Sequence, residues 1–356
     1  MKILFEHDHL YYLPQFEPVI QKLKMTGKHD LFGSINISVP KIERDLFDFE
    51  MNRLGLENVH GNFEPQRRQI LKEMNFDLIF VGNKSSLSSI KSVNSFSVMI
   101  YHGIGLKQSY YSDLTKDMDL ICVESDERKA ILEEKGFPAV STGFTKLDGF
   151  DSIEKYKNEK VNVLYAPTYF PSSLQKTIPY LNPINGLDLK IKLHHFYWTN
   201  PTYIKIRLLL ELAIQAQSNI EIIQFEHYNI LPFYAKADLM ISDISSTLFE
   251  FLPFNRPIIQ TTYSTLRLKY KLFPGQLKKR MDHDRLAQIN FTTRCNSPEQ
   301  LNGLIQESLH NPSTNSDERK NAKTKFLGRC DGQAAQRVLN ALESFGIPIG
   351  ESDSIG

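Results

Sequence analysis

The sequence has few of the features that mark membrane-spanning, secreted or nucleic-acid-binding proteins. It contains no run of about 18 apolar residues, so we expect no transmembrane helix. Its first stretch, MKILFEHDHLYYLP, is interrupted by Glu6, His7 and Asp8 before a signal-peptide core could form. The formal net charge of the 356 residues is only +1, which gives no support to nucleic acid as a partner. We expect a cytoplasmic globular protein.

Cysteine is scarce, and glycine-rich phosphate loops are absent. The three cysteines, Cys122, Cys295 and Cys330, lie far apart and show none of the short spacings of zinc or redox sites. We therefore expect reduced thiols and no metal centre. Neither a Walker loop nor a GxGxxG motif occurs, so a bound phosphate would have to be held in another way.

Short apolar runs alternate with helical patterns along most of the chain. Runs of four to seven residues rich in Val, Ile and Phe, separated by amphipathic stretches, are typical of parallel strands joined by helices. The fold class is therefore α/β. The predicted strands are KILFE, DLIFVG, FSVMIY, DLICVE and PAVSTG in the first half, and VNVLYAP, LKIKLHH, IEIIQF, DLMISD and PIIQ in the second.

A polar segment, DGFDSIEKYKNEK, interrupts this pattern between residues 148 and 160, and we place a domain boundary there. We predict two doubly wound, Rossmann-like domains that face a central cleft, at residues 1–150 and 151–330. Helical spacing of apolar residues predicts a closing helix at 331–349, and residues 350–356 form a polar tail that we expect to be disordered.

The first candidate site follows the strand FSVMIY. His102 stands directly after it, with Gly103 and Gly105 in a turn and then Lys107. Glycine permits positive φ and close approach to a ligand, and histidine titrates near neutrality, so this arrangement suits proton transfer. A histidine in a turn could alternatively form only local hydrogen bonds.

The second candidate follows the strand DLMIS. Asp243 ends the strand, and Ser245, Ser246 and Thr247 lead into a helix whose start has the capping pattern TLFE. Free N–H groups and hydroxyls at such a helix start can hold a diphosphate. The same atoms could serve only as a helix cap, and Glu250 could either close that cap or reach a ribose hydroxyl.

Two further segments carry polar candidates. In LKIKLHH, the strand period of two predicts that His194 and His195 lie on opposite faces, which makes them a poor metal site. The strand-to-turn element VLYAPTYFPSS could offer a ligand the hydroxyl of Thr168, Ser172 or Ser173. Residues 265–280 concentrate lysine and arginine among Leu, Tyr and Phe, so they form either a solvated face or a contact with anionic acceptor or lipid.

The order of these motifs resembles the CDP-glycerol glycerophosphotransferase family, which makes teichoic acids and related capsular polymers. The family's usual strings are close to WHGTPLK, GYPRxD, LYAPTWR, a strand ending in His, DYSSxxFDF followed by RPVI, and DGxASxR. The corresponding strings here are YHGIGLK, TGFTKLD, VLYAPTY, KLHH, DLMISDISSTLFEFLPFNRPII and DGQAAQRV. The resemblance implies a GT-B type fold and transfer of glycerol phosphate from CDP-glycerol to a hydroxyl acceptor, with release of CMP.

The resemblance also implies roles for individual residues. His102 matches the proposed base and His194 a second histidine near the donor phosphates. Ser245 and Ser246 match a serine pair on the diphosphate, and Glu250 stands where the family usually has Asp. His102 and His194 are the expected catalytic residues. The expected donor site consists of Ser245, Ser246, Glu250, Asp243, Thr247, Thr168 and Lys146. The expected acceptor site consists of Gly103, Gly105 and Lys107. No cofactor is required, although a divalent ion could assist at Asp243.

The chain departs from the family strings at several positions, among them Tyr101 for Trp, Lys146 for Arg and Phe170 for Arg. Three alternatives therefore stay open: a GT-B glycosyltransferase that uses a sugar nucleotide, a relative that transfers another CDP-linked polyol such as ribitol phosphate, and a catalytically inactive nucleotide-binding scaffold. The acceptor could be a lipid-linked sugar, a growing polymer or an oligosaccharide. Peripheral contact with the inner face of the plasma membrane through residues 265–280 is a further expectation.

Overall fold

The computed structural model describes residues 1–84, 86–150, 160–181 and 186–350, and it divides into two compact units. The first unit comprises residues 1–102, 113–152 and 325–356, and the second comprises 103–112 and 153–324. The sequence had assigned residues 103–112 to the first half and placed the boundary at 150. Residues 151–159, which contain most of the predicted linker, lie outside the described residues.

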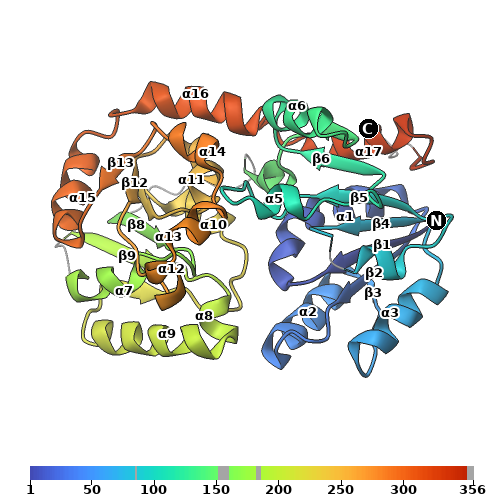
Figure 1. Cartoon of the computed structure of the whole chain (residues 1–356), viewed down its shortest axis with the longest axis horizontal. Coiled ribbons are helices and arrows are strands. Elements are labelled where there is room, and N and C mark those ends of the chain that lie inside the picture. Colours follow the sequence, from blue (N-terminus) through green and yellow to red (C-terminus); the bar gives the residue numbers. More distant parts are fainter. Residues whose placement is uncertain (85, 151–159, 182–185, 351–356) are drawn as a thin grey trace. The chain divides into compact units, whose positions relative to one another are not determined.

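The first unit is built on a parallel seven-stranded sheet of order β3-β2-β1-β4-β5-β6-β7 (Figure 1). Its strands are β1 Lys2–His7, β2 Asp30–Ile35, β3 Glu57–Asn58, β4 Leu78–Val81, β5 Phe96–Ile100, β6 Leu120–Val123 and β7 Ala139–Ser141. Its helices are α1 Leu13–Thr26, α2 Lys41–Leu54, α3 Glu64–Glu73, α4 Leu87–Ile90, α6 Asp126–Glu134 and α17 Ala334–Ser344, with 3-10 turns at η1 Leu10–Tyr12 and η2 Thr145–Gly149.

The second unit is built on a parallel six-stranded sheet of order β10-β9-β8-β11-β12-β13 (Figure 1). Its strands are β8 Val161–Ala166, β9 Leu187–Ile191, β10 Ile220–Ile222, β11 Leu239–Ser242, β12 Ile258–Thr261 and β13 Thr293–Cys295. Its longer helices are α9 Pro201–Ile214, α10 Leu231–Lys236, α15 Leu301–His310 and α16 Ser316–Leu327, in which the chain passes back into the first unit at residue 325.

Short helices connect these elements of the second unit. They are α5 Ser109–Ser112, α7 Leu174–Thr177, α8 Phe196–Thr199, α11 Thr247–Glu250, α12 Leu268–Leu272, α13 Pro274–Lys278 and α14 His283–Ala287, with 3-10 turns at η3 Ile178–Tyr180, η4 Leu252–Phe254 and η5 Pro298–Gln300. Buried residues of α9 and α15 share one apolar cluster with β8, β9 and β11, so both helices cover the same face of this sheet.

The α/β prediction is confirmed, and each of the ten predicted strands is present. Every residue of β4, β6 and β11 is buried, which explains their continuous apolar runs, because a parallel sheet is covered on both faces. Three strands escaped prediction: β2, which contains Gly33, and the short edge strands β3 and β13. Both sheets have the strand order of a Rossmann fold, and the first adds a seventh strand.

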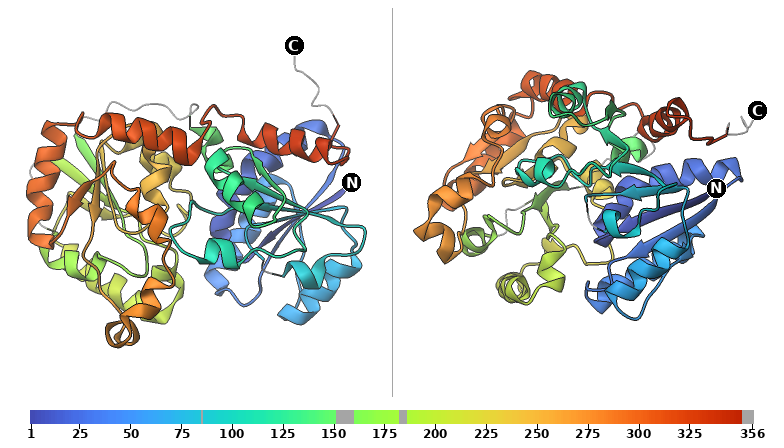
Figure 2. Two further views of the ribbon diagram at one scale, coloured as in Figure 1. Left: turned by 45° about the horizontal axis from the view of Figure 1, so that its top comes forward. Right: turned by 45° about the vertical axis from the view of Figure 1, so that its right-hand side comes forward.

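The helix α6 near residue 130 has a defined start and end, and the predicted helix at the C-terminal end is also present. The Ser125 hydroxyl accepts a hydrogen bond from the Arg128 N–H at 3.3 Å and caps α6, and Gly136 follows it with a φ of +79°. The predicted closing helix corresponds to α17, which packs on α1 within the first unit (Figure 2). The predicted disordered tail lies outside the described residues, except for Gly350.

Within the described part of the chain, none of the helices combines the length and the apolar character needed to cross a membrane.

Candidate functional site

Polar residues gather at the carboxyl ends of the central strands in both units. Each sheet changes direction of winding between two neighbouring strands, β1 and β4 in the first unit and β8 and β11 in the second. Ligands of doubly wound folds bind beyond the carboxyl ends of the strands at these points.

His102 follows β5 in the first unit, and its imidazole is held in a defined tautomer. Its Nδ1 lies 2.9 Å from the carbonyl oxygen of Gly82, which can only accept a hydrogen bond. The proton of a neutral ring is therefore on Nδ1, and the lone pair is on Nε2. Burial lowers the pKa of His102, so the ring is neutral at neutral pH. A neutral histidine with a lone pair on Nε2 has the form that a general base requires.

Tyr12 supports this imidazole, and sequence reasoning missed it. The Tyr12 ring is stacked on His102 with centroids 4.7 Å apart and planes 19° apart, and its hydroxyl accepts a hydrogen bond from the Asn83 amide at 2.8 Å. That amide also donates to Asp8 at 2.9 Å. A Cβ on Gly82 would lie only 2.5 Å from the Tyr12 ring, so glycine is required there. Asp8 and Gly82 directly follow β1 and β4, and this position at strand ends was a signal that could have found them.

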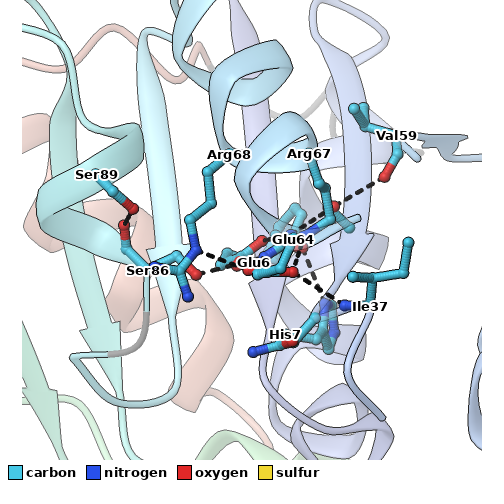
Figure 3. Close-up of polar contacts among 12 residues, drawn as sticks. Glu6, His7, Ile37, Val59, Glu64, Arg67, Arg68, Ser86 and Ser89 are labelled. Carbon is cyan, nitrogen blue, oxygen red and sulfur yellow. Dashed lines mark hydrogen bonds and ion pairs between the residues drawn. The ribbon is translucent and has the colours of Figure 1, made fainter. Parts of the chain in front are cut away.

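A buried ion-pair network lies beside the carboxyl end of β1 (Figure 3). Arg67 of α3 donates two hydrogen bonds to Glu6, at 2.8 and 2.9 Å, and two to Glu64, at 2.9 and 2.7 Å. Burial raises the pKa of Glu6, whereas hydrogen bonds from Arg67 and Arg68 outweigh burial and bring the pKa of Glu64 to about 2. Arg67 also donates to Ser34, so the network ties α3 to β1 and β2.

The glycines of the first motif are needed for a different reason than the one predicted. Neither Gly103 nor Gly105 has a positive φ, so this turn does not use the left-handed conformation that glycine permits. Both belong to the second unit, where a Cβ on Gly105 would lie 2.0 Å from the Tyr110 ring. A Cβ on Gly103 would lie 2.9 Å from the Tyr110 hydroxyl and 3.2 Å from the Ser246 hydroxyl. Because glycine has no side chain, Tyr110 and Ser246 can pack directly against this segment of backbone.

The two predicted lysines lie in different units. Lys107 belongs to the second, where it pairs with Met281 in an antiparallel bridge and its ammonium lies 4.9 Å from the centre of the Tyr169 ring. Burial and the neighbouring Arg280 lower the pKa of Lys107 to about 8. Lys146 is half-buried in η2 of the first unit, whereas the other residues predicted for the donor lie in the second unit.

Asp243 holds together two segments of the second unit. It follows β11, is buried, and accepts hydrogen bonds from the backbone N–H groups of Thr168 at 2.8 Å and Ser173 at 3.0 Å. The Ser173 hydroxyl donates a third at 3.0 Å. Burial raises the pKa of Asp243 to about 6. The Ser172 hydroxyl lies 3.0 Å from that of Tyr197, so the two serine hydroxyls among the three predicted for this turn make internal hydrogen bonds.

The serine segment after Asp243 enters a helix of only one turn, α11. Ser245, Ser246 and Thr247 are half-buried, and the Thr247 hydroxyl lies 2.7 Å from that of Ser242. The predicted capping box, with Thr247 as the cap, is wrong: Thr247 is already the first residue of the helix, and Ser246, which precedes it, makes no side-chain cap. Glu250 is buried, and its carboxylate instead accepts a hydrogen bond from the Tyr234 hydroxyl at 3.1 Å.

The two adjacent histidines lie side by side, so the prediction of opposite faces is wrong. β9 ends at Ile191, and His195 already has helical dihedral angles of −53° and −30° at the start of α8. The two rings are consequently 4.4 Å apart. His194 accepts a hydrogen bond on Nδ1 from the Phe196 N–H at 3.2 Å, which places the proton of the neutral ring on Nε2. Its ring also contacts Tyr169 at 4.6 Å.

The model of the CDP-glycerol:poly(glycerophosphate) glycerophosphotransferase family matches residues 151–344, which is more than half of the chain. The chain belongs to this family. It is therefore an enzyme, a transferase of glycerol phosphate from CDP-glycerol. No curated protein matches the chain by sequence.

Solved structures with the same arrangement of elements confirm the GT-B type of fold. A variant of the wall teichoic acid polymerase TagF with CDPG is 14% identical, with a TM-score of 0.68 over 97% of this chain and 88% of that one. The S. aureus MnaA–UDP structure is 14% identical, with a TM-score of 0.66 over 100% of both chains. UDP-GlcNAc 2-epimerase from Neisseria meningitidis bound to UDP-GlcNAc is 14% identical, with a TM-score of 0.61 over 97% of this chain and 100% of that one.

Proposed function

We propose that the protein transfers glycerol phosphate from CDP-glycerol to a hydroxyl group of an acceptor in the synthesis of a teichoic acid or capsule-like polymer. The acceptor oxygen attacks the phosphorus that carries glycerol, and a new phosphorus–oxygen bond forms. The bond from that phosphorus to the oxygen bridging to CMP breaks, and CMP leaves. The proton of the acceptor hydroxyl passes to His102. Family membership carries the reaction, and the geometry of His102 supports its role.

His102 acts as the general base through Nε2. The Gly82 carbonyl oxygen accepts the Nδ1 proton, and burial lowers the pKa of the ring, so Nε2 carries a lone pair at neutral pH. After it takes the acceptor proton, the imidazolium keeps its hydrogen bond to the same carbonyl. Phosphoryl transfer depends mainly on positioning and electrostatics, so a covalent nucleophile is not needed.

Residues of the second unit bind the donor phosphates. His194 presents an N–H at Nε2, because its Nδ1 accepts from Phe196, so it can donate a hydrogen bond to a phosphate oxygen. The half-buried hydroxyls of Ser245, Ser246 and Thr247 lie at the carboxyl end of β11, where they can add further donors. The donor roles of Thr168, Lys146 and Glu250 stay predictions, and the internal bond of Glu250 to Tyr234 makes its role the least supported of the three.

The structure supports a positioning role for Asp243 rather than a role in binding a divalent ion. Its carboxylate already accepts three hydrogen bonds from Thr168 and Ser173. We therefore propose that transfer needs no cofactor. Chelation of divalent ions in the activity assay tests this directly: an unchanged rate is expected, and abolished transfer would contradict it.

The acceptor is a lipid-linked sugar, a growing polymer or an oligosaccharide, and the enzyme meets it at the inner face of the plasma membrane. Residues 265–280 support membrane contact. Leu268, Leu272 and Phe273 are 70%, 64% and 57% exposed, and the segment contains no acidic residue. Its six cations are Arg267, Lys269, Lys271, Lys278, Lys279 and Arg280. Exposed apolar side chains among cations are typical of segments that bind anionic lipid surfaces.

A donor panel followed by phosphorus NMR tests this function. The protein is incubated with a hydroxyl acceptor and, separately, with CDP-glycerol, CDP-ribitol, UDP-glucose and UDP-N-acetylglucosamine. We expect CMP from CDP-glycerol and no UDP from the sugar nucleotides. UDP release without CMP release would establish the alternative, a GT-B glycosyltransferase that uses a sugar nucleotide. CDP-glycerol binding without release of any nucleotide would indicate an inactive scaffold.

A further inference from the structure

Three cations lie on or next to the aromatic residues Tyr169, Phe170, Tyr203 and Tyr270 of the second unit. The ammonium of Lys107 lies 4.9 Å from the ring centre. Burial raises the pKa of Tyr169, while the positive charges of Arg280 and Arg267 act in the opposite direction. Arg267 lies over the ring of Phe170, the residue next to Tyr169 in sequence. Lys107 is more than 150 positions from the two arginines in sequence. We call Lys107, Arg267 and Arg280 the Tyr169 cation cluster.

Aromatic residues hold the two arginines of the cluster in place. Arg267 lies 4.5 Å from the centre of the Phe170 ring and donates a hydrogen bond to the Tyr203 hydroxyl. Arg280 donates to the hydroxyl of Tyr270, whose ring lies 5.2 Å from that of Phe170. These aromatic partners are buried and uncharged, so the cations are positioned without being neutralised.

The backbone brings Lys107 to the same place. Lys107 pairs with Met281 in an antiparallel bridge, and the N–H of Gln108 donates to the carbonyl oxygen of Arg280 at 3.0 Å. Lys107 and Arg280 therefore lie on adjacent segments, although both carry positive charge. The proximity of Arg280, after burial, helps to lower the pKa of Lys107 to about 8.

The cluster has an excess of positive charge. Among the described residues, no carboxylate lies within ion-pair distance of any of its three cations. The buried Asp243 acts on Lys107 electrostatically, but its oxygens accept hydrogen bonds from Thr168 and Ser173. Placing like charges together costs free energy that an anion bound among them would offset.

We propose that the Tyr169 cation cluster binds a phosphate group of a substrate. Arginine and lysine are the usual partners of phosphate oxygens. The His194 ring lies 4.6 Å from that of Tyr169, so the cluster adjoins the histidine that we propose binds the donor phosphates. This inference rests on the proposed function for the source of the phosphate, which is either the diphosphate of the donor or a phosphate of the acceptor.

Calorimetric titration of the full chain with CDP and with glycerol 3-phosphate tests the proposal. The variants are Lys107→Gln and Arg267→Gln. The matched control is Lys205→Gln, which removes one exposed cation from α9 of the same unit. Circular dichroism and thermal unfolding confirm that each variant is folded. We expect at least tenfold weaker binding of one probe in both variants and unchanged binding in the control, with Arg267→Lys retaining most of the affinity.

Each outcome of the titrations decides the proposal. Weakened CDP binding assigns the cluster to the donor, and weakened glycerol 3-phosphate binding with unchanged CDP binding assigns it to the acceptor. Equal affinities in variants and control, or no binding of either probe to the unchanged protein, would overturn it. Because Lys107 loses its charge above about pH 8, binding to the unchanged protein should also weaken there more than binding to Lys107→Gln.

The proposed function and the cluster can fail separately. Transfer from CDP-glycerol is measured by phosphorus NMR on the unchanged protein. Absence of transfer, together with probe binding that depends on Lys107 and Arg267, would overturn the proposed function and leave the cluster as a phosphate site. Normal transfer, together with probe binding that is equal in the variants and the unchanged protein, would support the proposed function and overturn the cluster as a phosphate site.

Discussion

The Nδ1 atom of His102 lies 2.9 Å from the carbonyl oxygen of Gly82, at the end of the neighbouring strand β4. This contact determines which nitrogen of the neutral ring bears the proton. Gly82 therefore has two functions. Its carbonyl oxygen orients His102, and the absence of a Cβ makes room for the Tyr12 ring.

Replacement of His102 tests the base. We expect His102→Ala to lower kcat by about 10²–10⁴-fold, the usual contribution of a general base, with little change in CDP-glycerol binding. CMP release and calorimetry measure the two quantities. His60→Ala, which removes an exposed histidine of the same unit, is the control and should be fully active. A fully active His102→Ala enzyme would exclude the role.

Tyr12 should set the pH range in which His102 works. Because the base is active when neutral, kcat/KM falls as pH drops through the His102 pKa, which burial holds below 6.5. In Tyr12→Leu the ring face is exposed to water, so the pKa rises and the acidic limb moves to higher pH. Tyr12→Phe keeps the stacked ring, so the acidic limb of its kcat/KM profile should stay at the pH found for the unchanged enzyme. The same acidic limb in the leucine variant and the unchanged enzyme would show that stacking does not matter.

Asp243→Asn should destabilise the second unit by about 1–3 kcal/mol, because the amide nitrogen cannot accept hydrogen bonds from Ser173. The folded-state pKa of Asp243, about 6, lies above its ordinary value of 3.8, so the native state binds more protons between these values. Its contribution to the free energy of unfolding therefore falls as pH rises from about 4 to 6.

Urea unfolding of both proteins across this range measures the effect of Asp243. The stability gap between the unchanged protein and the asparagine variant should narrow as pH rises. Asp284→Asn, at an exposed position, should show no gap at any pH. A gap that widens with rising pH would contradict the raised pKa.

The ion-pair network of the first unit predicts that replacing Arg67 lowers the free energy of unfolding much more than replacing its neighbour Arg68. Arg67 is 1% exposed, so Arg67→Met leaves the Glu6 carboxylate buried without its partner and should cost about 3–5 kcal/mol. The side chain of Arg68 is 39% exposed, and Arg68→Met should cost about 0–1 kcal/mol. Denaturant unfolding measures both. Similar losses of unfolding free energy in the two variants would mean that the buried Arg67–Glu6 pair contributes no more to stability than the exposed pair of Arg68.

Membrane contact through residues 265–280 is tested with vesicles. Serine at Leu268, Leu272 and Phe273 should reduce binding to phosphatidylglycerol vesicles at least tenfold, since each large apolar side chain contributes about 1.5–3 kcal/mol when fully buried. Flotation in a density gradient measures binding. Serine at Leu208, Leu209 and Leu212 on α9, which are similarly exposed, is the control. Loss of binding only in the α9 variant would place the contact there.

Much of the fold could be predicted because buried parallel strands produce apolar runs that are visible in the sequence. The strands that escaped prediction lack this signal: β3 has two residues, β13 is a short edge strand, and β2 is interrupted by Gly33. His194 and His195 were misplaced because the apolar pattern does not show that the strand ends at Ile191. The turn that follows brings the two rings together.

The amino-acid sequence was sufficient to place His102 and Asp243 just after the ends of strands. Only the tertiary structure decided their chemistry. The tautomer of His102 depends on Gly82, 20 positions away, and Tyr12, 90 positions away, covers the face of its ring. The charge around Lys107 depends on Arg280. Protonation responds to burial and to the few atoms in contact with a group, and in these cases the contacts join segments that are distant in the sequence.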